Sequence, residues 1–213
     1  MKQRIRILPF LLLAVVSFSC SAQKKEKDTR VNLTPPPGKA IAAFAEGCFW
    51  CSEHIYDSVV GVDSVISGYA GGNVANPSYE LVNTETTGHA ETILVYYDPK
   101  LVSYKDLVEV FFSSQDPTTL NRQGPDRGTS YRSILFYRGE QEKAIAEQAK
   151  IDFQKNFKRP IVTEIKELRA FYRAEDYHQN YVEQNPNNPY ISGVSVPRFM
   201  LFKKTYKGDK LKK

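Results

Sequence analysis

Cysteine and histidine, the residues that most often bind zinc, are scarce in this sequence, whose 213 residues include three of each. One C-x-x-C motif is present at Cys48 and Cys51, but a second such motif and a pair of closely spaced histidines are both absent. Structural zinc sites usually combine two such motifs. A small zinc-binding module is therefore a minor alternative, and its candidate ligands would be Cys48, Cys51, His54 and His89.

The N-terminus lacks an apolar run long enough to span a membrane. Residues 7–18 are mostly apolar, follow Lys2, Arg4 and Arg6, and precede small residues. As a helix this run would cover about 18 Å, against about 30 Å for the hydrocarbon core of a bilayer. The layout is that of a secretory signal, so we expect residues 1–20 to be removed and the protein to be exported to the periplasm or cell envelope.

Cys20 occupies the position at which a bacterial lipoprotein signal places its modified cysteine. Position 17, however, is Ser, where such signals usually have Leu, Val or Ile. Two outcomes are therefore open: a lipid on Cys20 that tethers the protein to a membrane, or simple cleavage that leaves Cys20 unmodified.

The middle of the chain has no excess of positive charge, although the formal net charge is +5. Residues 39–202 carry 16 basic and 21 acidic side chains, and the surplus of Lys and Arg lies at the two ends. A net acidic core argues against a nucleic-acid partner. We expect residues 21–38, which end in TPPPG, to form a polar, proline-rich linker, and residues 206–213 to form a basic, solvated tail.

The composition suits a single domain at residues 39–205, because 41% hydrophobic residues can form one buried core but hardly two. Four strands are predicted, at residues 40–46, 62–69, 92–97 and 131–137. One helix is predicted to begin near Cys48, and another at an N-cap on Ser103. The order strand, helix, strand, strand, helix, strand is that of a ferredoxin-like split βαβ core, an α+β fold that packs as a two-layer sandwich.

Other segments complete the predicted fold. A helix at about 140–157 and a strand at about 161–167 extend the core. Residues 70–88 and 114–130 are predicted to form long irregular loops, which in a compact domain are often functional. The C-terminal segment, with prolines at 186, 189 and 197, is predicted to be irregular.

Cys48 lies on a predicted strand-to-helix turn, so its thiol would sit at a helix N-terminus, where backbone N–H groups favour the thiolate. A thiol of pKa about 8.5 is only a few per cent ionised at pH 7, whereas one of pKa about 7 is half ionised. A structural disulfide to Cys51 would close so short a loop that it would stabilise the fold by only about 2 kcal/mol. Inert buried thiols are a further alternative. The motif alone equally suits a thioredoxin-like thiol-disulfide oxidoreductase.

Further motifs narrow these alternatives, and they occur in the order GCFWC at 47–51, NPSYE at 76–80, GHAE at 88–91, DPTTLNRQGPDRGTSYRS at 116–133 and AEDYHQNY at 174–181. Over roughly residues 40–200 the sequence resembles the A-type peptide methionine sulfoxide reductases in these blocks and in their order. Thioredoxin-like sites, by contrast, place a tryptophan before the first cysteine. The resemblance implies an enzyme that reduces the S epimer of methionine sulfoxide, free or in oxidised proteins, with neither metal nor organic cofactor. We expect it to act as a monomer.

The same resemblance implies roles for Cys48 and Glu91. Cys48 would attack the sulfoxide sulfur, and Glu91 of GHAE would protonate the departing oxygen, which is a very poor leaving group as free oxide. Because a glutamate of pKa about 4.3 is almost fully ionised at pH 7, Glu91 must be buried to act as an acid. Its place at the start of a predicted strand makes burial expected.

The resemblance implies five further site residues. Tyr79 and Tyr131 would hydrogen-bond the sulfoxide oxygen, with Asp126 as a polar partner. Phe49 and Trp50 would enclose the S-methyl group. Taken singly, a tyrosine is more often a packing residue. Core packing is also the alternative for Phe49 and Trp50, for which the cage is favoured only because they adjoin Cys48.

The resemblance also implies how the enzyme is recycled. Attack by Cys48 would release methionine and leave a sulfenic acid, which condenses with a nearby thiol to a disulfide. Many members of the family carry resolving cysteines near the C-terminus, but this chain has none after Cys51. Cys51 or an external thiol must therefore resolve the sulfenic acid, and a thioredoxin-like dithiol partner would then reduce the disulfide.

Overall fold

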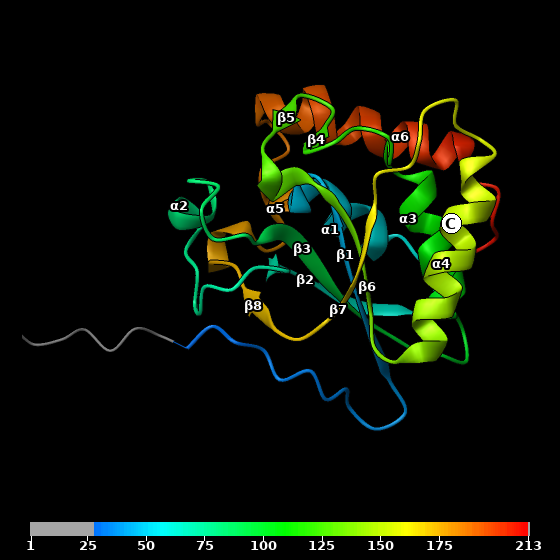
Figure 1. The fold of residues 1–213 in the computed structure, drawn as a ribbon. Helices are drawn as coiled ribbons and strands as arrows, with labels where there is room; N and C mark the ends of the chain where they lie inside the picture. Colours follow the sequence, from blue (N-terminus) through cyan, green and yellow to red (C-terminus); the bar gives the residue numbers. More distant parts are fainter. Residues whose placement is uncertain (1–27, 213) are drawn as a thin grey trace, which may run out of the picture.

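The computed structural model describes residues 28–212, so the predicted signal and Cys20 lie outside the described residues. A six-stranded sheet runs through the domain in the order β7-β6-β1-β3-β2-β8 (Figure 1). Its strands are β1 (Ala40–Glu46), β2 (Val62–Ala70), β3 (Ala90–Tyr97), β6 (Ser133–Tyr137), β7 (Glu164–Glu167) and β8 (Phe171–Arg173).

The four central strands have the predicted ferredoxin-like topology. β3 lies between β1 and β2 and is antiparallel to both, and β1 lies in the same way between β3 and β6. A helix joins each split pair: α1 (Phe49–Asp57) connects β1 to β2, and α3 (Tyr104–Ser113) connects β3 to β6. At the edges, β7 pairs in parallel with β6, and β8 pairs antiparallel with β2. The predicted α+β core is thus confirmed.

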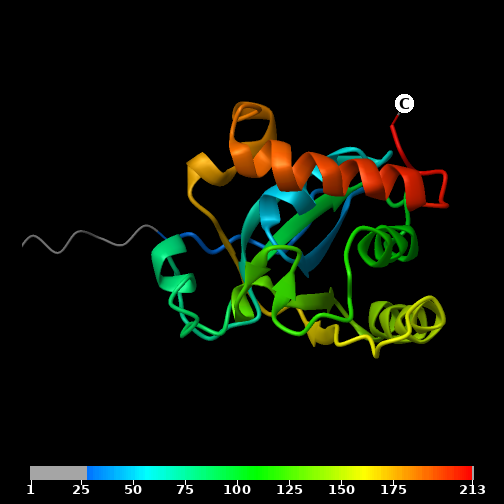
Figure 2. The ribbon, with the colours of Figure 1, turned by 90° about the horizontal axis from the view of Figure 1, so that it is seen from above.

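The longer helices pack together over one face of the sheet. α4 (Glu140–Gln154) packs beside α3, and α6 (Val196–Thr205) lies across α1 (Figure 2). α3 begins with the predicted cap, since Ser103 Oγ accepts from the Asp106 N–H and the Asp106 carboxylate accepts from the Ser103 N–H. Among residues 28–212, no helix combines the length and the apolar character that crossing a bilayer requires.

Both faces of the sheet are covered, which explains why β1 is almost wholly apolar. The face beneath the helices carries a cluster of large side chains that includes Phe44, Ile55, Ile93 and Phe111. The opposite face carries a smaller cluster that includes Ile41, Leu94, Ile134 and Phe171, with Val31 and Leu33 packed against it. The chain preceding β1 therefore serves as the cover of the second face (Figure 1).

The predicted domain limits of 39–205 are too narrow at both ends. The Val31 N–H donates to the Phe171 carbonyl at 2.9 Å, so part of the predicted linker belongs to the fold. In the predicted solvated tail, the Lys210 carbonyl accepts from the Val60 N–H at 2.7 Å. Val31, Leu33 and Leu211 pack against the domain, although the segments around them are mostly polar. The overall composition of these segments does not reveal such single apolar contacts.

The prediction of an irregular C-terminal segment is wrong for β8 and α6. α6 has Pro197 in its first turn, where the missing N–H leaves no hydrogen bond unmade, so a proline there starts a helix as readily as it ends one. β8 has three residues, too few for an alternating pattern to be visible. A short helix, α2 (Tyr79–Val82), likewise interrupts the loop predicted at residues 70–88.

Candidate active site

The turn between β1 and α1 presents Cys48. This residue is the N-cap of α1, and its carbonyl accepts from the Cys51 N–H at 3.1 Å. The preceding Gly47 has φ +90°, which side-chain-bearing residues rarely adopt, and a Cβ there would lie 2.5 Å from the Cβ of Gln123. Glycine therefore lets the chain turn from strand to helix directly against the hairpin at 122–127.

Replacing Gly47 by Ala is expected to lower the free energy of unfolding by more than about 1 kcal/mol, because backbone strain and a steric clash act together. Urea denaturation followed by circular dichroism measures the change. Gly139→Ala is the matched control, since Gly139 has φ +89° but no atom within 4 Å of the corresponding Cβ. Equal losses in the two variants would show that contact with Gln123 adds nothing.

Cys48 and Cys51 are buried free thiols that titrate as a pair. The pKa of Cys51 is lowered to about 6, because the Cys48 thiol hydrogen-bonds to it and Arg198 and Ser195 lie close by. Burial, together with the neighbouring Cys51, raises the pKa of Cys48 well above its ordinary value. The negative charge of the pair thus lies mainly on Cys51. Burial and the neighbouring Cys51 thus oppose the ionisation of Cys48 that its position at a helix N-terminus favours.

Glu91, the second residue of β3, is 2% exposed, so the burial expected of it is confirmed. Its Oε2 accepts a hydrogen bond of 2.9 Å from the N–H of Phe49, the residue after Cys48. Burial raises the pKa of Glu91 to about 8, and the charge of Asp126 adds to the effect. Glu91 is therefore mostly protonated at pH 7 and holds its proton close to Cys48.

Tyr79 and Tyr131 come from separate elements, and the charge of Glu91 acts on both hydroxyls. Tyr79 begins α2, and Tyr131 ends the 3-10 turn Thr129–Tyr131. Burial raises the pKa of both hydroxyls, and the negative charge of Glu91 raises it further. Asp126, the first residue of β5 (Asp126–Arg127), acts electrostatically on all three groups. The structure thus brings the predicted polar residues together, with both tyrosines kept as neutral donors.

Tyr190 also belongs to this site, although no sequence pattern indicates it. Its hydroxyl donates to Asp126 Oδ2 at 2.5 Å, and its ring meets Trp50 edge-on at 5.9 Å between centroids. Burial raises the pKa of Tyr190, and the charges of Cys48 and Cys51 add to this effect. Tyr190 ends the segment NPNNPY, whose prolines signal a loop and whose residues show no periodicity.

Phe49 and Trp50 differ in the surface that each can offer to a ligand. Phe49 is 1% exposed and packs on Tyr69 and His178, with centroid distances of 5.9 and 4.9 Å. Trp50 is partly exposed, stacks on Tyr181 at 3.8 Å, and donates from Nε1 to His178 Nδ1 at 3.1 Å. Core packing therefore accounts for Phe49, and Trp50 has the accessible apolar surface.

A buried ion pair next to the thiols was also absent from the sequence-based prediction. Glu46, the last residue of β1, pairs through Oε1 with Arg198 Nη2 of α6 at 2.9 Å. Glu46 Oε2 accepts from the Ser114 hydroxyl at 2.8 Å, and Arg198 Nε donates to the Ser114 carbonyl at 2.8 Å. A charged residue that ends the otherwise apolar run AIAAFAE was the one available signal of this pair.

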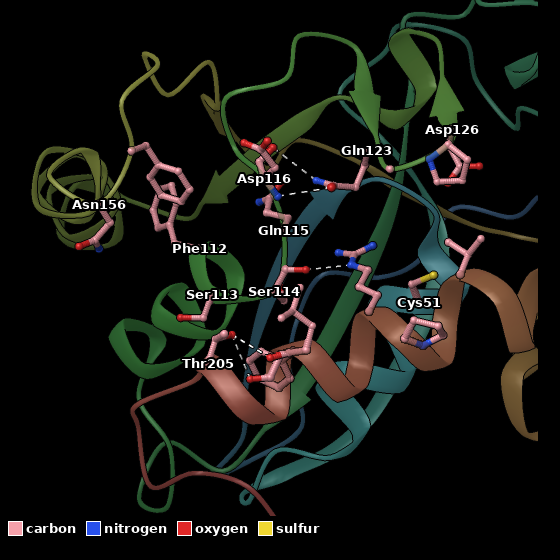
Figure 3. A pocket seen from close by; sticks show the side chains of 18 of the residues that line it. Cys51, Phe112, Ser113, Ser114, Gln115, Asp116, Gln123, Asp126, Asn156 and Thr205 are labelled. Atoms are coloured by element: carbon pink, nitrogen blue, oxygen red, sulfur yellow. Dashed lines mark hydrogen bonds between the residues drawn. The ribbon is translucent and has the colours of Figure 1, made fainter.

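A cavity of about 800 Å³ reaches Cys51 (Figure 3). Its walls come from α3 and the segment after it, the 122–127 hairpin and α6, and of the two thiols only that of Cys51 lines it. Phe112 and Leu201 contribute apolar surface. Gln115 contributes an amide whose two polar atoms are buried without a hydrogen-bond partner. The cavity thus offers a ligand a route to Cys51.

The described residues do not assemble a metal site. His89 Nε2 lies 2.8 Å from the Val74 carbonyl, and His54 packs edge-on against Phe199. Within residues 28–212, no three or more His, Cys, Asp or Glu side chains are grouped so that they could hold a metal ion. The zinc alternative therefore has no ligand set around the thiols.

Known proteins resemble this chain over nearly all of its described length. Residues 40–211 match the family model described as peptide methionine sulfoxide reductase. The peptide methionine sulfoxide reductase MsrA of Saccharolobus solfataricus is 46% identical over 172 residues, covering 81% of this chain and 97% of that protein. The reduced form of Mxr1 from Saccharomyces cerevisiae is 34% identical with a TM-score of 0.70, covering 75% of this chain and 92% of that one. Mxr1 in complex with Trx2 is 26% identical with a TM-score of 0.51, covering 70% and 94%.

Proposed function

The chain belongs to the peptide methionine sulfoxide reductase family and is a thiol-dependent oxidoreductase, and on that premise we propose that Cys48 and Glu91 reduce the S epimer of methionine sulfoxide, free or in oxidised proteins, to methionine. One observation carries this assignment of residues. The buried Glu91 carboxyl accepts a hydrogen bond of 2.9 Å from the backbone amide that follows Cys48. An acid and a nucleophile held this close suit the cleavage of a sulfur–oxygen bond.

In the first step, Tyr79 and Tyr131 donate hydrogen bonds to the sulfoxide oxygen and polarise its bond to sulfur. Cys48 passes its proton to Cys51 and attacks the sulfoxide sulfur, while protonated Glu91 gives its proton to the oxygen. The substrate sulfur gains two electrons and leaves as methionine. The Cys48 sulfur loses two electrons and becomes a sulfenic acid.

Recognition of the terminal methyl group falls to the aromatic residues after Cys48. Trp50 offers accessible apolar surface, and Phe49, whose ring centroid lies 6.4 Å from that of Trp50, supports it from the core. Asp126, fixed by Tyr190, orients the polar side of the substrate.

In the second step, Cys51 attacks the sulfenic acid, so that a Cys48–Cys51 disulfide and water form. A thioredoxin-like dithiol then restores both thiols by exchange. The solved complex of the relative Mxr1 with Trx2 supports this choice of reductant. The cavity lined by Cys51 supports this step too, because it gives a reductant access to that sulfur.

A single-turnover experiment tests the proposed function. Reduced protein lacking residues 1–20 is mixed with each epimer of a methionine sulfoxide peptide, and the methionine formed and the thiols lost are both counted. We expect methionine from the S epimer alone, with Cys48 and Cys51 joined afterwards. If the folded protein yields no methionine from either epimer but exchanges its thiols with disulfides, it is a thiol-disulfide oxidoreductase instead.

We further propose that the protein is exported to the cell envelope, is anchored there by a lipid on Cys20 and acts as a monomer. The basic, apolar and small-residue layout of residues 1–20 supports export. Wild-type protein is expected in the membrane fraction and the Cys20→Ser variant in the soluble fraction, where sedimentation should give the mass of one chain. Soluble wild-type protein would exclude the anchor.

A further inference from the structure

The proposed reduction step leaves unused two residues that approach Cys51 from the C-terminal helix. Ser195 Oγ lies 3.1 Å from Cys51 Sγ, and both side chains are almost fully buried. Ser195 ends a π-helical turn, Ile191–Ser195, that leads directly into α6. Such turns are rare and occur often at functional sites, where they aim a side chain that a regular helix would not.

Arg198 follows Ser195 by one turn and places a positive charge beside the same thiol. Its side chain is 14% exposed and, like Cys51, lines the cavity. Nη2 donates to both Oε1 and the carbonyl of Glu46, at 2.9 and 3.0 Å. Removing two charges from water usually costs more than their attraction returns, so a buried ion pair is a poor stabilising device and needs another reason to exist.

We propose that Ser195 and Arg198 maintain Cys51 as the thiolate that resolves the sulfenic acid of Cys48. Ser195 acts as a catalytic residue, because its hydroxyl donates to the reacting sulfur. Arg198 acts as a positioning residue, whose charge favours the thiolate over the thiol. The inference rests on the proposed function, because it concerns the second half of the same cycle.

Cys51, which received the proton of Cys48 in the first step, returns it to the Glu91 carboxylate and becomes the thiolate. The Cys51 thiolate attacks the Cys48 sulfur, so that a sulfur–sulfur bond forms and the sulfur–oxygen bond breaks. Hydroxide leaves, takes a proton from Glu91 and becomes water. Cys51 sulfur is oxidised and Cys48 sulfur is reduced in forming the shared bond. No reactant beyond the protein itself is required.

Glu46 explains how Arg198 can stay in place throughout the cycle. Five titratable groups act on Cys51, namely Cys48, Tyr190, Arg198, Glu46 and Glu91. Arg198 is the cation among these five groups, and burial raises the pKa of Glu46 to about 7. While the thiolate exists, Arg198 compensates it, and Glu46, whose pKa lies near 7, can take up a proton. Once the disulfide has consumed the thiolate, Glu46 still compensates Arg198, so that no unpaired charge is left buried.

The test measures the two half-reactions separately in a single turnover with an S-epimer methionine sulfoxide peptide. At pH 5, below the pKa of Cys51, Ser195→Ala and Arg198→Gln should form the disulfide about tenfold more slowly than the wild type, as a rise of about one unit in that pKa implies. At pH 7, where about half of Cys51 would still be ionised after such a rise, release of methionine should stay within about twofold of the wild-type rate. Sulfenic acid should then accumulate and be trapped by a 1,3-dione. The pH midpoint for alkylation of Cys51 should rise by about one unit, and Arg198→Lys should restore most of the rate.

Ser192→Ala is the matched control, because Ser192 is exposed on the same π-helical turn. Wild-type rates of disulfide formation at pH 5 in both test variants would overturn the proposal, as would a tenfold fall in methionine release at pH 7. If Arg198→Gln does not fold, Ser195→Ala carries the test, since it removes one oxygen atom. Failure of the proposed function is distinct, because wild-type protein would then release no methionine.

Discussion

Replacing Cys48 by Ser is expected to abolish methionine formation, with a fall of at least about a thousandfold in the single-turnover rate. A serine hydroxyl is not ionised near neutral pH and attacks sulfur poorly. Rapid quenching followed by chromatographic detection of methionine measures the rate.

Cys51→Ser is the matched control for this loss. It removes the second thiol of the same turn but leaves Cys48, so one equivalent of methionine should still form and the Cys48 sulfenic acid should persist. Methionine from Cys48→Ser at a rate near that of the wild type would remove Cys48 from the role of nucleophile.

Replacing Glu91 by Gln is expected to slow methionine formation by about 10²- to 10⁴-fold with little change in substrate binding, because the amide keeps the shape of the acid but has no proton of comparable acidity to give. Glu147→Gln on the exposed surface of α4 is the control for loss of one carboxylate. Equal single-turnover rates in Glu91→Gln and the wild type would refute the assignment of the acid.

The single-turnover rate of methionine formation should depend on pH, because the pKa of Cys51 is lowered and the pKa of Glu91 is raised. The thiol pair gains its negative charge as pH rises through about 6, and Glu91 loses its proton as pH rises through about 8. The nucleophile and the acid are therefore both available between these values. Above the upper value, the rate should fall by about tenfold per unit. The alkaline fall should disappear in Glu91→Gln, and its persistence there would assign it to another group.

The parts of the fold that sequence reasoning predicted are those that local pattern determines. β1 and α1 follow from an apolar run and a glycine turn, and the cap on Ser103 follows from a three-residue spacing. Glu91 was found through its motif, and its burial follows from its place in a central strand. Each of these features depends on residues close together in the chain.

The residues that sequence reasoning missed reach the site through long-range packing. Tyr190, Ser195 and Arg198 lie in a segment rich in proline and polar residues, and they approach the thiols only because α6 packs on α1. The burial of Cys48, which opposes its ionisation, was missed for a related reason. A helix N-terminus can be recognised from spacing, whereas the burial of Cys48 and its contact with Tyr190, more than a hundred residues away, depend on how distant segments pack.

Residues 28–38, which pack on the second face of the sheet, limit the distance that a membrane anchor at Cys20 would allow between the enzyme and the bilayer. Since residues 28–38 lie against the domain, only residues 21–27 separate it from Cys20. A chain of that length spans at most about 25 Å when fully extended. A lipid on Cys20 would thus hold the active site within roughly one domain diameter of the bilayer. The substrates in reach would be methionines exposed on neighbouring envelope proteins, so that repair would be confined to the membrane surface.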